Sequence, residues 1–230
     1  MQYEVEIKTL LGSKENADGL LSRMRELDPS MELRSRNSQL NHYFVGGNLA
    51  RLAEAVSDII SPEATVQLKD LATRAKDFSV RTRQKDLPAG QVGEEVILVA
   101  KVSVGDDTSA NGVSRIEFEE TVPVTLAELD QRLLDAGFEY QAKWSREREE
   151  YACMGVAVCL DRNAGYGYLA EFERVVEDAS AVENARTQLV DLMEQLAVSE
   201  LPQDRLERMF AHYNQNWSDY YGTDKIFIIE

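Results

Sequence analysis

The stretch that decides the fold is Glu4-Val-Glu6-Ile-Lys8, close to the start of the chain. Residues two apart in a β-strand share a face, so Glu4, Glu6 and Lys8 point to one side of a strand over 2–10. Positions 3, 5 and 7 hold Tyr, Val and Ile and make the other side apolar. The stretch therefore predicts a strand with one charged face and one face that packs against a core.

The same alternation returns in later strands, again with charged residues two apart. The groups that share a face are Arg81 and Arg83 in 78–84, Arg115, Glu117 and Glu119 in 113–122, and Glu171 and Glu173 in 168–176. Two further charged residues stand alone in apolar surroundings. Lys101 lies inside an apolar run, and Asp161 follows the apolar residues of 156–160. A charge in such a setting is costly without partners.

Two arrangements could explain this pattern. One is an antiparallel sheet with a solvated face and cross-strand ion pairs. A solvated face normally mixes Thr, Ser, Gln and Lys, whereas these faces pair like charges, which repel unless an opposite charge lies between them. Arginine pairs favour a polyanion and glutamate pairs favour a cation. We therefore expect an α+β fold built on a closed antiparallel barrel, with inward charges and metal ions that bridge carboxylates to a polyphosphate.

Composition excludes several classes of protein. The 230 residues include 41 acidic and 25 basic ones, a net charge of −16, which argues against a nucleic-acid or anionic-membrane surface. No uninterrupted apolar run reaches the roughly 18 residues of a membrane span, and the charged N-terminus does not resemble a signal peptide. Only Cys153 and Cys159 are cysteines, which favours a reducing compartment. We expect a cytoplasmic protein with no nucleic-acid or membrane partner.

The sequence also predicts helices between the expected strands. Apolar spacing and end signals predict helices over 13–27, 48–60, 62–76, 125–137, 180–197 and from 202 onward, and further strands over 31–45, 94–104, 138–151, 156–162 and in the tail 226–230. Thr125 with Glu128, and Ser180 with Glu183, have the spacing of capping boxes. His42 and His212 are far apart and are interpreted as a strand-edge and a helix-surface histidine, not as a zinc or catalytic pair. No composition shift marks a domain boundary.

The ordered motifs resemble those of the CYTH domains, also called triphosphate tunnel metalloenzymes. Glu4-Val-Glu6-Ile-Lys8 is similar to the Glu-x-Glu-x-Lys motif of that family. Further resemblances follow in chain order: QLNHYF (39–44), Arg81-Thr-Arg83, Lys101, Arg115-Ile-Glu117-Phe-Glu119, the basic segment Lys143, Arg146 and Arg148 closing on Tyr151, Asp161 before Gly165-Tyr-Gly167, and Glu171-Phe-Glu173. One such motif alone is weak, whereas the ordered set is specific.

The resemblance implies a single CYTH-type domain over 1–230, with an eight-stranded antiparallel closed barrel at about 2–176 and a helical part at about 180–230. Helices would pack outside the barrel, whose tunnel would hold a triphosphate with Mg²⁺ or Mn²⁺. The implied metal ligands are Glu4, Glu6, Glu171 and Glu173, followed by Glu119 and Asp161. The implied phosphate-binding residues are Lys8, Arg81, Arg83, Lys101, Arg115, Lys143, Arg146 and Arg148. Lys8 and Lys101 are the catalytic candidates.

Three functions remain open. A triphosphatase acting on inorganic triphosphate, thiamine triphosphate or a nucleoside triphosphate needs only phosphate and metal contacts, and these are the signals present. An adenylyl cyclase, which makes cyclic AMP and pyrophosphate from ATP, must also hold the nucleoside. A non-catalytic polyphosphate-binding module would not need the carboxylates. The sequence departs from the family at an insert over about 48–76, expected at the tunnel mouth, and at Lys143, whose strand parity opposes Arg146 and Arg148.

Overall fold

The computed structural model describes residues 3–87, 93–103 and 116–229, and it has the expected α+β class. The strands are β1 (Tyr3–Gly12), β2 (Glu32–Gly46), β3 (Asp77–Asp86), β4 (Glu94–Ser103), β5 (Ile116–Val122), β6 (Phe138–Cys153), β7 (Val156–Asn163) and β8 (Gly167–Val176). The helices are α1 (Lys14–Leu27), α2 (Leu49–Ala55), α3 (Pro62–Arg74), α4 (Leu126–Asp135), α5 (Val182–Gln195) and α6 (Gln203–Tyr220), with a short 3₁₀ turn at Ala179–Ala181.

The eight strands form one antiparallel sheet in the order β1-β8-β7-β6-β2-β3-β4-β5. The eight antiparallel strands of the sequence prediction are thereby confirmed. Within the described ranges, no hydrogen-bonded ladder joins the end strands β1 and β5. Closure of the sheet into a barrel therefore stays a prediction.

The chain divides into two compact units. The described part of the first unit comprises residues 3–38 and 145–229, and that of the second unit comprises 39–87, 93–103 and 116–144. The long strands β2 and β6 each contribute residues to both units. Each unit has its own hydrophobic core.

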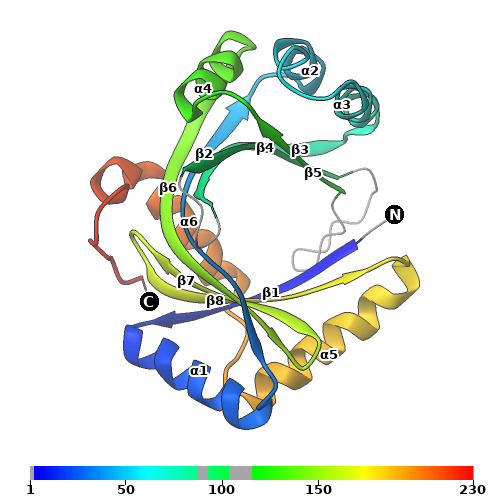
Figure 1. Ribbon diagram of the computed structural model, residues 1–230. Coiled ribbons are helices and arrows are strands. Elements are labelled where there is room, and N and C mark those ends of the chain that lie inside the picture. The colour runs from blue at the N-terminus through cyan, green and yellow to red at the C-terminus, as the bar shows by residue number, and fades with distance from the viewer. Residues whose placement is uncertain (1–2, 88–92, 104–115, 230) are drawn as a thin grey trace. The chain divides into compact units, whose positions relative to one another are not determined.

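The first unit buries the apolar face of β1, β7 and β8 under α1 and α5 (Figure 1). Val5 and Ile7 alternate with the charged residues of β1 and are each 1% exposed. They share this core with Phe172 of β8, Leu20 of α1 and Leu189 of α5. The apolar half of the strand pattern therefore faces the helices, and the charged half lies on the opposite face of these strands.

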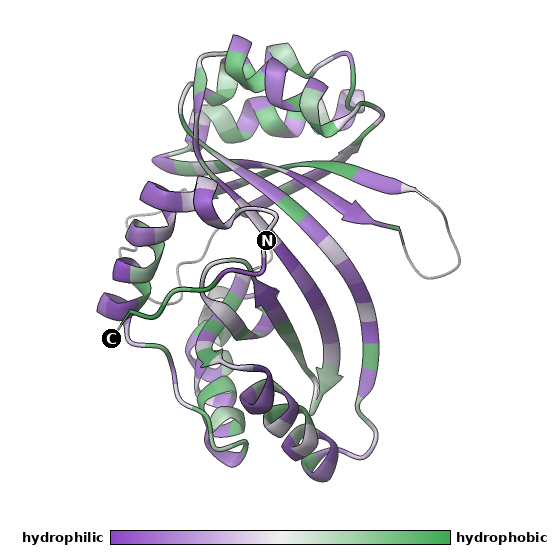
Figure 2. Ribbon diagram, turned by 90° about the vertical axis from the view of Figure 1, so that its left-hand side faces the viewer, coloured by the Kyte–Doolittle hydropathy of each residue, from purple (hydrophilic) through white to green (hydrophobic). Residues whose placement is uncertain are grey.

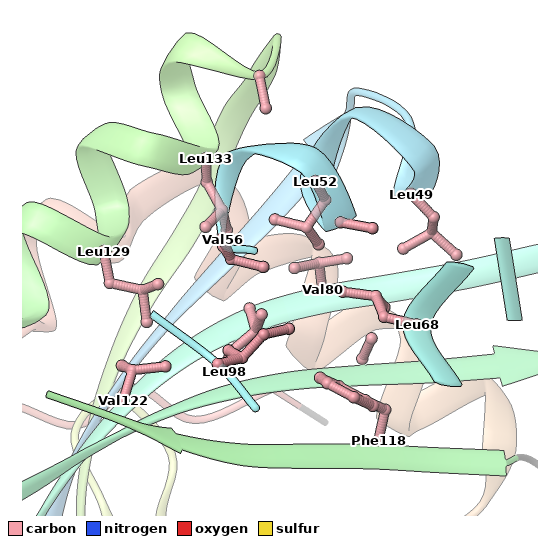
Figure 3. Packing of buried hydrophobic residues seen from close by; sticks show 14 of the residues in the cluster. Leu49, Leu52, Val56, Leu68, Val80, Leu98, Phe118, Val122, Leu129 and Leu133 are labelled. Atoms are coloured by element: carbon pink, nitrogen blue, oxygen red, sulfur yellow. The ribbon is translucent and has the colours of Figure 1, made fainter. Parts of the chain in front are cut away.

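The second unit buries the corresponding face of β3, β4 and β5 under α2, α3 and α4, as Figure 3 shows. Leu98 of β4 and Phe118 of β5 meet Leu52 of α2, Leu68 of α3 and Leu129 of α4 in this core. The insert over 48–76 thus forms two helices whose leucines are core residues of this unit.

The helix ends follow local hydrogen bonds. Thr125 and Glu128 form the predicted capping box at the start of α4. The predicted box of Ser180 and Glu183 is wrong: α5 begins after Ala181 without a side-chain cap. The Ser180 N–H instead donates to the Asp178 carboxylate at 2.8 Å, which holds Ser180 in the 3₁₀ turn.

The expected tail strand is reduced to an isolated bridge between Ile226 and Gly165. The helices alternate between hydrophilic and hydrophobic residues along their length (Figure 2). None of the helices in the described ranges is long and apolar enough to cross a membrane.

Truncation of Leu129 tests the core of the second unit. Leu129 is 0% exposed, so Leu129→Ala should lower the free energy of unfolding by about 2–5 kcal/mol through lost burial and a residual cavity. Urea denaturation followed by circular dichroism measures the loss. Leu33, which is 49% exposed, is the control, and Leu33→Ala should stay within about 0.5 kcal/mol of the wild type. Equal losses in the two variants would contradict the assigned packing.

Candidate active site

The charged face of the first unit is assembled by the register of β1 and β8. Glu6 lies opposite Glu173, and Lys8 lies opposite Glu171. These residues alternate with the buried residues of the same strands, so the pattern that packs the core also gathers the charges on one face. All four predicted glutamates of these two strands therefore belong to one face.

Three of these glutamates could hold a metal ion. One carboxylate oxygen each of Glu4, Glu6 and Glu173 lies within 4.8 Å of the others, and all three side chains are half-buried. Hard carboxylate oxygens are the ligands that Mg²⁺ and Mn²⁺ prefer, and Mg²⁺ usually keeps some water or phosphate ligands beside them. The donor set thus fits the divalent cation expected from the sequence.

Lys8 connects the carboxylate cluster to the rest of this face. Its ammonium group contacts the carboxylate of Glu6 and lies 3.3 Å from Glu171. The guanidinium of Arg148 also contacts Glu171. Burial alone would raise the pKa of Glu171, but the positive charges of Arg148, Lys8 and Arg146 outweigh it and hold the pKa well below its usual range. Glu171 is therefore an anion that holds two basic side chains.

Asp161 fixes two arginines. It is 1% exposed, and its two oxygens accept bonds of 2.7 and 2.6 Å from Arg148 in a bidentate pair. Arg146 donates to the same carboxylate at 2.9 Å. Both arginines therefore point to the face that carries Asp161. Asp161 was predicted as a metal ligand, yet in this structure both of its oxygens are bound by arginine.

The second unit carries its own set of paired charges on β2, β3, β4 and β5. Arg81 donates to the Tyr43 hydroxyl at 2.9 Å and to Glu117 at 3.3 Å. Arg83 donates to the Asn41 side-chain oxygen at 3.0 Å and to Glu119 at 3.1 Å. Glu119, a predicted metal ligand, is thus an arginine partner here.

The environment of Arg81 keeps it charged. Burial alone would lower the pKa of Arg81, but the oxygens of Tyr43, Glu117 and Glu119 raise it overall. Lys101 belongs to the same face, since its Nζ lies 3.4 Å from Glu117. The arginine pair and the single lysine predicted for this region are therefore brought together around two glutamates, whereas Arg115 lies outside the described residues.

Lys143 lies apart from the arginine pair of its own strand. Its Nζ lies 4.1 Å from the centre of the Tyr140 ring, and both residues line an open hollow of about 510 Å³ beside α4. Trp144, in contrast, contacts Tyr43 on the charged face, with ring centres 5.9 Å apart. Tyr140 and Trp144 have the same parity but opposite faces, so β6 departs from simple alternation between them.

Several partners in the second unit were not predicted. His42 is 5% exposed and donates from Nδ1 to Asp130 at 2.6 Å, which corrects its interpretation as a strand-edge histidine. The signal was its parity, because His42 alternates with Asn41 and Tyr43 and shares the apolar face of Phe44. Asp130 likewise lies on the buried stripe of α4, where a charged residue indicates a partner.

Comparison with known proteins identifies the family of this chain. The model of the CYTH domain matches residues 2–205. A search of curated proteins gave no significant match. Among solved structures, a protein of Pyrococcus horikoshii is similar at 22% identity and a TM-score of 0.62, over 91% of this chain and 99% of that chain.

Two further structures share the fold. A candidate adenylate cyclase of Vibrio parahaemolyticus is 20% identical, with a TM-score of 0.55, over 86% of this chain and 90% of that chain. A candidate adenylate cyclase of Bacillus halodurans is 18% identical, with a TM-score of 0.50, over 87% of this chain and 94% of that chain. These likenesses concern the fold, whereas the family match extends over most of the sequence. The chain therefore belongs to the CYTH domain family.

Proposed function

We propose that this CYTH domain is a metal-dependent triphosphatase, which adds water across a phosphoanhydride bond of inorganic triphosphate or an organic triphosphate. One connected charge network in the first unit supports the proposal. It joins the carboxylate cluster to two half-buried arginines through unbroken ion pairs. Its members in order of contact are Glu6, Lys8, Glu171, Arg148, Asp161 and Arg146.

Glu4, Glu6 and Glu173 would hold the divalent cation. When bound, the ion supplies positive charge to the phosphate oxygens, which carry most of the charge in phosphoryl transfer. Lys8 contacts Glu6 and would neutralise phosphate charge next to this cluster. The arrangement suits a reaction that depends on charge neutralisation and alignment rather than on a covalent intermediate.

Arg146 and Arg148 would bind phosphate oxygens. Asp161 holds both guanidinium groups in place before any ligand arrives, which lowers the cost of ordering them. Arginine forks bind phosphate with two parallel bonds and remain charged at every physiological pH. In the second unit, Arg81, Arg83 and Lys101 would serve the same purpose. Lys8 and Lys101 are the proposed catalytic residues.

Adenylyl cyclase activity is the second candidate, because two structures of similar fold are described as candidate adenylate cyclases. Cyclisation requires the ribose 3′-hydroxyl to attack the α-phosphorus and expel pyrophosphate, so the nucleoside must be held as firmly as the phosphates. Hydrolysis requires only a water in line with a phosphorus. The residues assembled on the two charged faces would supply phosphate and cation contacts, which favours hydrolysis.

Product analysis decides between the two reactions. With Mg²⁺ or Mn²⁺ we expect inorganic triphosphate to yield phosphate and pyrophosphate faster than ATP is converted, and EDTA to abolish turnover until metal is restored. Phosphate release and chromatography of the nucleotides measure both outcomes. Cyclic AMP and pyrophosphate from ATP, with inorganic triphosphate inert, would establish the cyclase instead. Full turnover in EDTA would refute the metal role.

Cation binding can be measured without turnover. Glu6→Gln and Glu173→Gln each remove one ligand charge from the cluster, so each should weaken Mn²⁺ binding by about 10-fold or more. Electron paramagnetic resonance of free Mn²⁺ gives the affinity. Glu139→Gln is the control, since Glu139 is exposed on β6 in the other unit. Unchanged Mn²⁺ affinity in both cluster variants would place the cation elsewhere.

The arginines of the second unit can be tested by affinity. Loss of one charge-assisted contact costs roughly 1.5–3 kcal/mol, so Arg81→Ala should weaken inorganic triphosphate binding about 10- to 150-fold. Isothermal titration calorimetry measures the dissociation constant. Arg162→Ala is the matched control, because Arg162 is 40% exposed and pairs with Glu147 and Asp224. An Arg81→Ala protein with wild-type affinity would make this arginine purely structural.

A further inference from the structure

One buried carboxylate in the second unit holds three side chains from three strands. Asp130 of α4 is 4% exposed and accepts hydrogen bonds from His42 of β2 at 2.6 Å, Thr82 of β3 at 2.6 Å and Tyr140 of β6 at 2.7 Å. Thr82 is 0% exposed and His42 is 5% exposed, so Asp130 and these two partners are buried. The network lies on the helix-covered face of these strands, opposite the face of Arg81 and Arg83.

The two strand residues that Asp130 holds are paired with each other. His42 lies opposite Thr82 in the β2–β3 ladder. The neighbouring pairs are Tyr43 opposite Arg81 on one side and Asn41 opposite Arg83 on the other. Asp130 therefore binds the cross-strand pair that lies between the pair containing Arg81 and the pair containing Arg83.

Because side chains alternate between the two faces of a strand, the contact of Asp130 with Thr82 also fixes the direction of the neighbouring side chains. Thr82 points to α4, so Arg81 and Arg83 on either side of it point to the opposite face. A hydrogen bond that fixes Thr82 limits rotation of β3 about its own axis and thereby limits the directions open to both arginines. The bond to His42 does the same for β2, which carries the Tyr43 and Asn41 oxygens that receive those arginines.

The chemistry of the network suits a residue that orients its partners rather than one that stabilises the fold. Burial of Asp130 would raise its pKa, but the bonds from His42, Thr82 and Tyr140 outweigh it and lower the pKa overall. A well-packed apolar group usually stabilises such a position at least as well as a buried charge. A carboxylate has what an apolar group lacks, namely directional bonds that define the rotation of each strand.

We propose that Asp130 is a positioning residue that acts through Thr82 and His42 to aim Arg81 and Arg83 at the phosphate groups of the substrate. The proposal rests on the proposed function, because it assigns those arginines to phosphate binding. Asp130 itself makes no contact with the substrate. Its removal changes how well the arginines are placed, and the effect on ligand binding passes entirely through them.

Thr82→Val is the principal test, because it keeps the shape of the side chain and removes only the bond to Asp130. We expect it to weaken inorganic triphosphate binding by roughly 3- to 30-fold in the wild-type background and to have less than a twofold effect in an Arg81→Ala/Arg83→Ala background. Its effect on the melting temperature should be the same in both backgrounds. Thr121→Val is the matched control, since Thr121 is an exposed strand threonine bonded to Glu95.

The same fold loss in both backgrounds would overturn the proposal, since the effect of Thr82 would then bypass the arginines. Wild-type affinity in Thr82→Val would overturn it as well. Asp130→Asn provides a second variant with the same expected dependence on the arginines. Asp135→Asn is its control, because Asp135 lies exposed on the same helix and accepts only from Gln131 among the bonds described.

A readout without ligand separates this proposal from the proposed function. The Arg83 Nε–H signal in a ¹⁵N spectrum reports its bond to Asn41 and is assigned with Arg83→Lys. We expect this signal to shift or broaden in Thr82→Val and Asp130→Asn and to stay unchanged in both controls. An unchanged signal in both variants would refute the positioning role. A wild-type protein that binds no triphosphate would refute the proposed function, and the arginine signal would then decide the positioning role alone.

Discussion

Alternation along the strands is the constraint on which the rest of the structure depends. Val5 and Ile7 must lie under α1 and α5, and this requirement places Glu4, Glu6 and Lys8 on the other face. A register shift of one residue would bury three charges and expose two core residues, so the hydrophobic core also protects the geometry of the site. The helices and the charged faces are therefore two consequences of one pattern.

Like charges on these faces are tolerable because each group has an opposite charge close by. In the first unit the buried Asp161 pairs with Arg146 and Arg148, and Glu171 also pairs with Arg148. In the second unit Glu117 and Glu119 pair with Arg81 and Arg83. The arginines are thus held in place without a ligand. A phosphate bound to them would join an existing network instead of assembling one, which would reduce the entropy lost on binding.

The sequence was sufficient to predict those features that depend only on residues close together in the chain. Alternation predicted the charged faces, and the Thr125 spacing predicted a capping box that is present. The Ser180 box failed because Asp178, two residues away, captures the Ser180 amide. Parity also predicted that Lys143 lies on the face opposite to Arg146 and Arg148, in agreement with its contact with Tyr140. The departure from alternation between Tyr140 and Trp144 could not be predicted, since it depends on contacts with Tyr43 and α4 that are far away in the chain. Partners of this kind appear only when the strands are paired.

The carboxylates divide into two classes that composition alone does not separate. Asp161 is almost fully buried and has both oxygens bound by arginine, so a cation there would displace a bidentate ion pair at a large cost in free energy. Glu4, Glu6 and Glu173 are half-buried and converge within 4.8 Å, where a cation would relieve their mutual repulsion. Parity placed Asp161 and Glu173 on the same face, but only their partners distinguish an acid that orients arginines from one suited to hold a metal ion. Burial and pairing, rather than residue type, therefore decide the role of each acidic residue on this face.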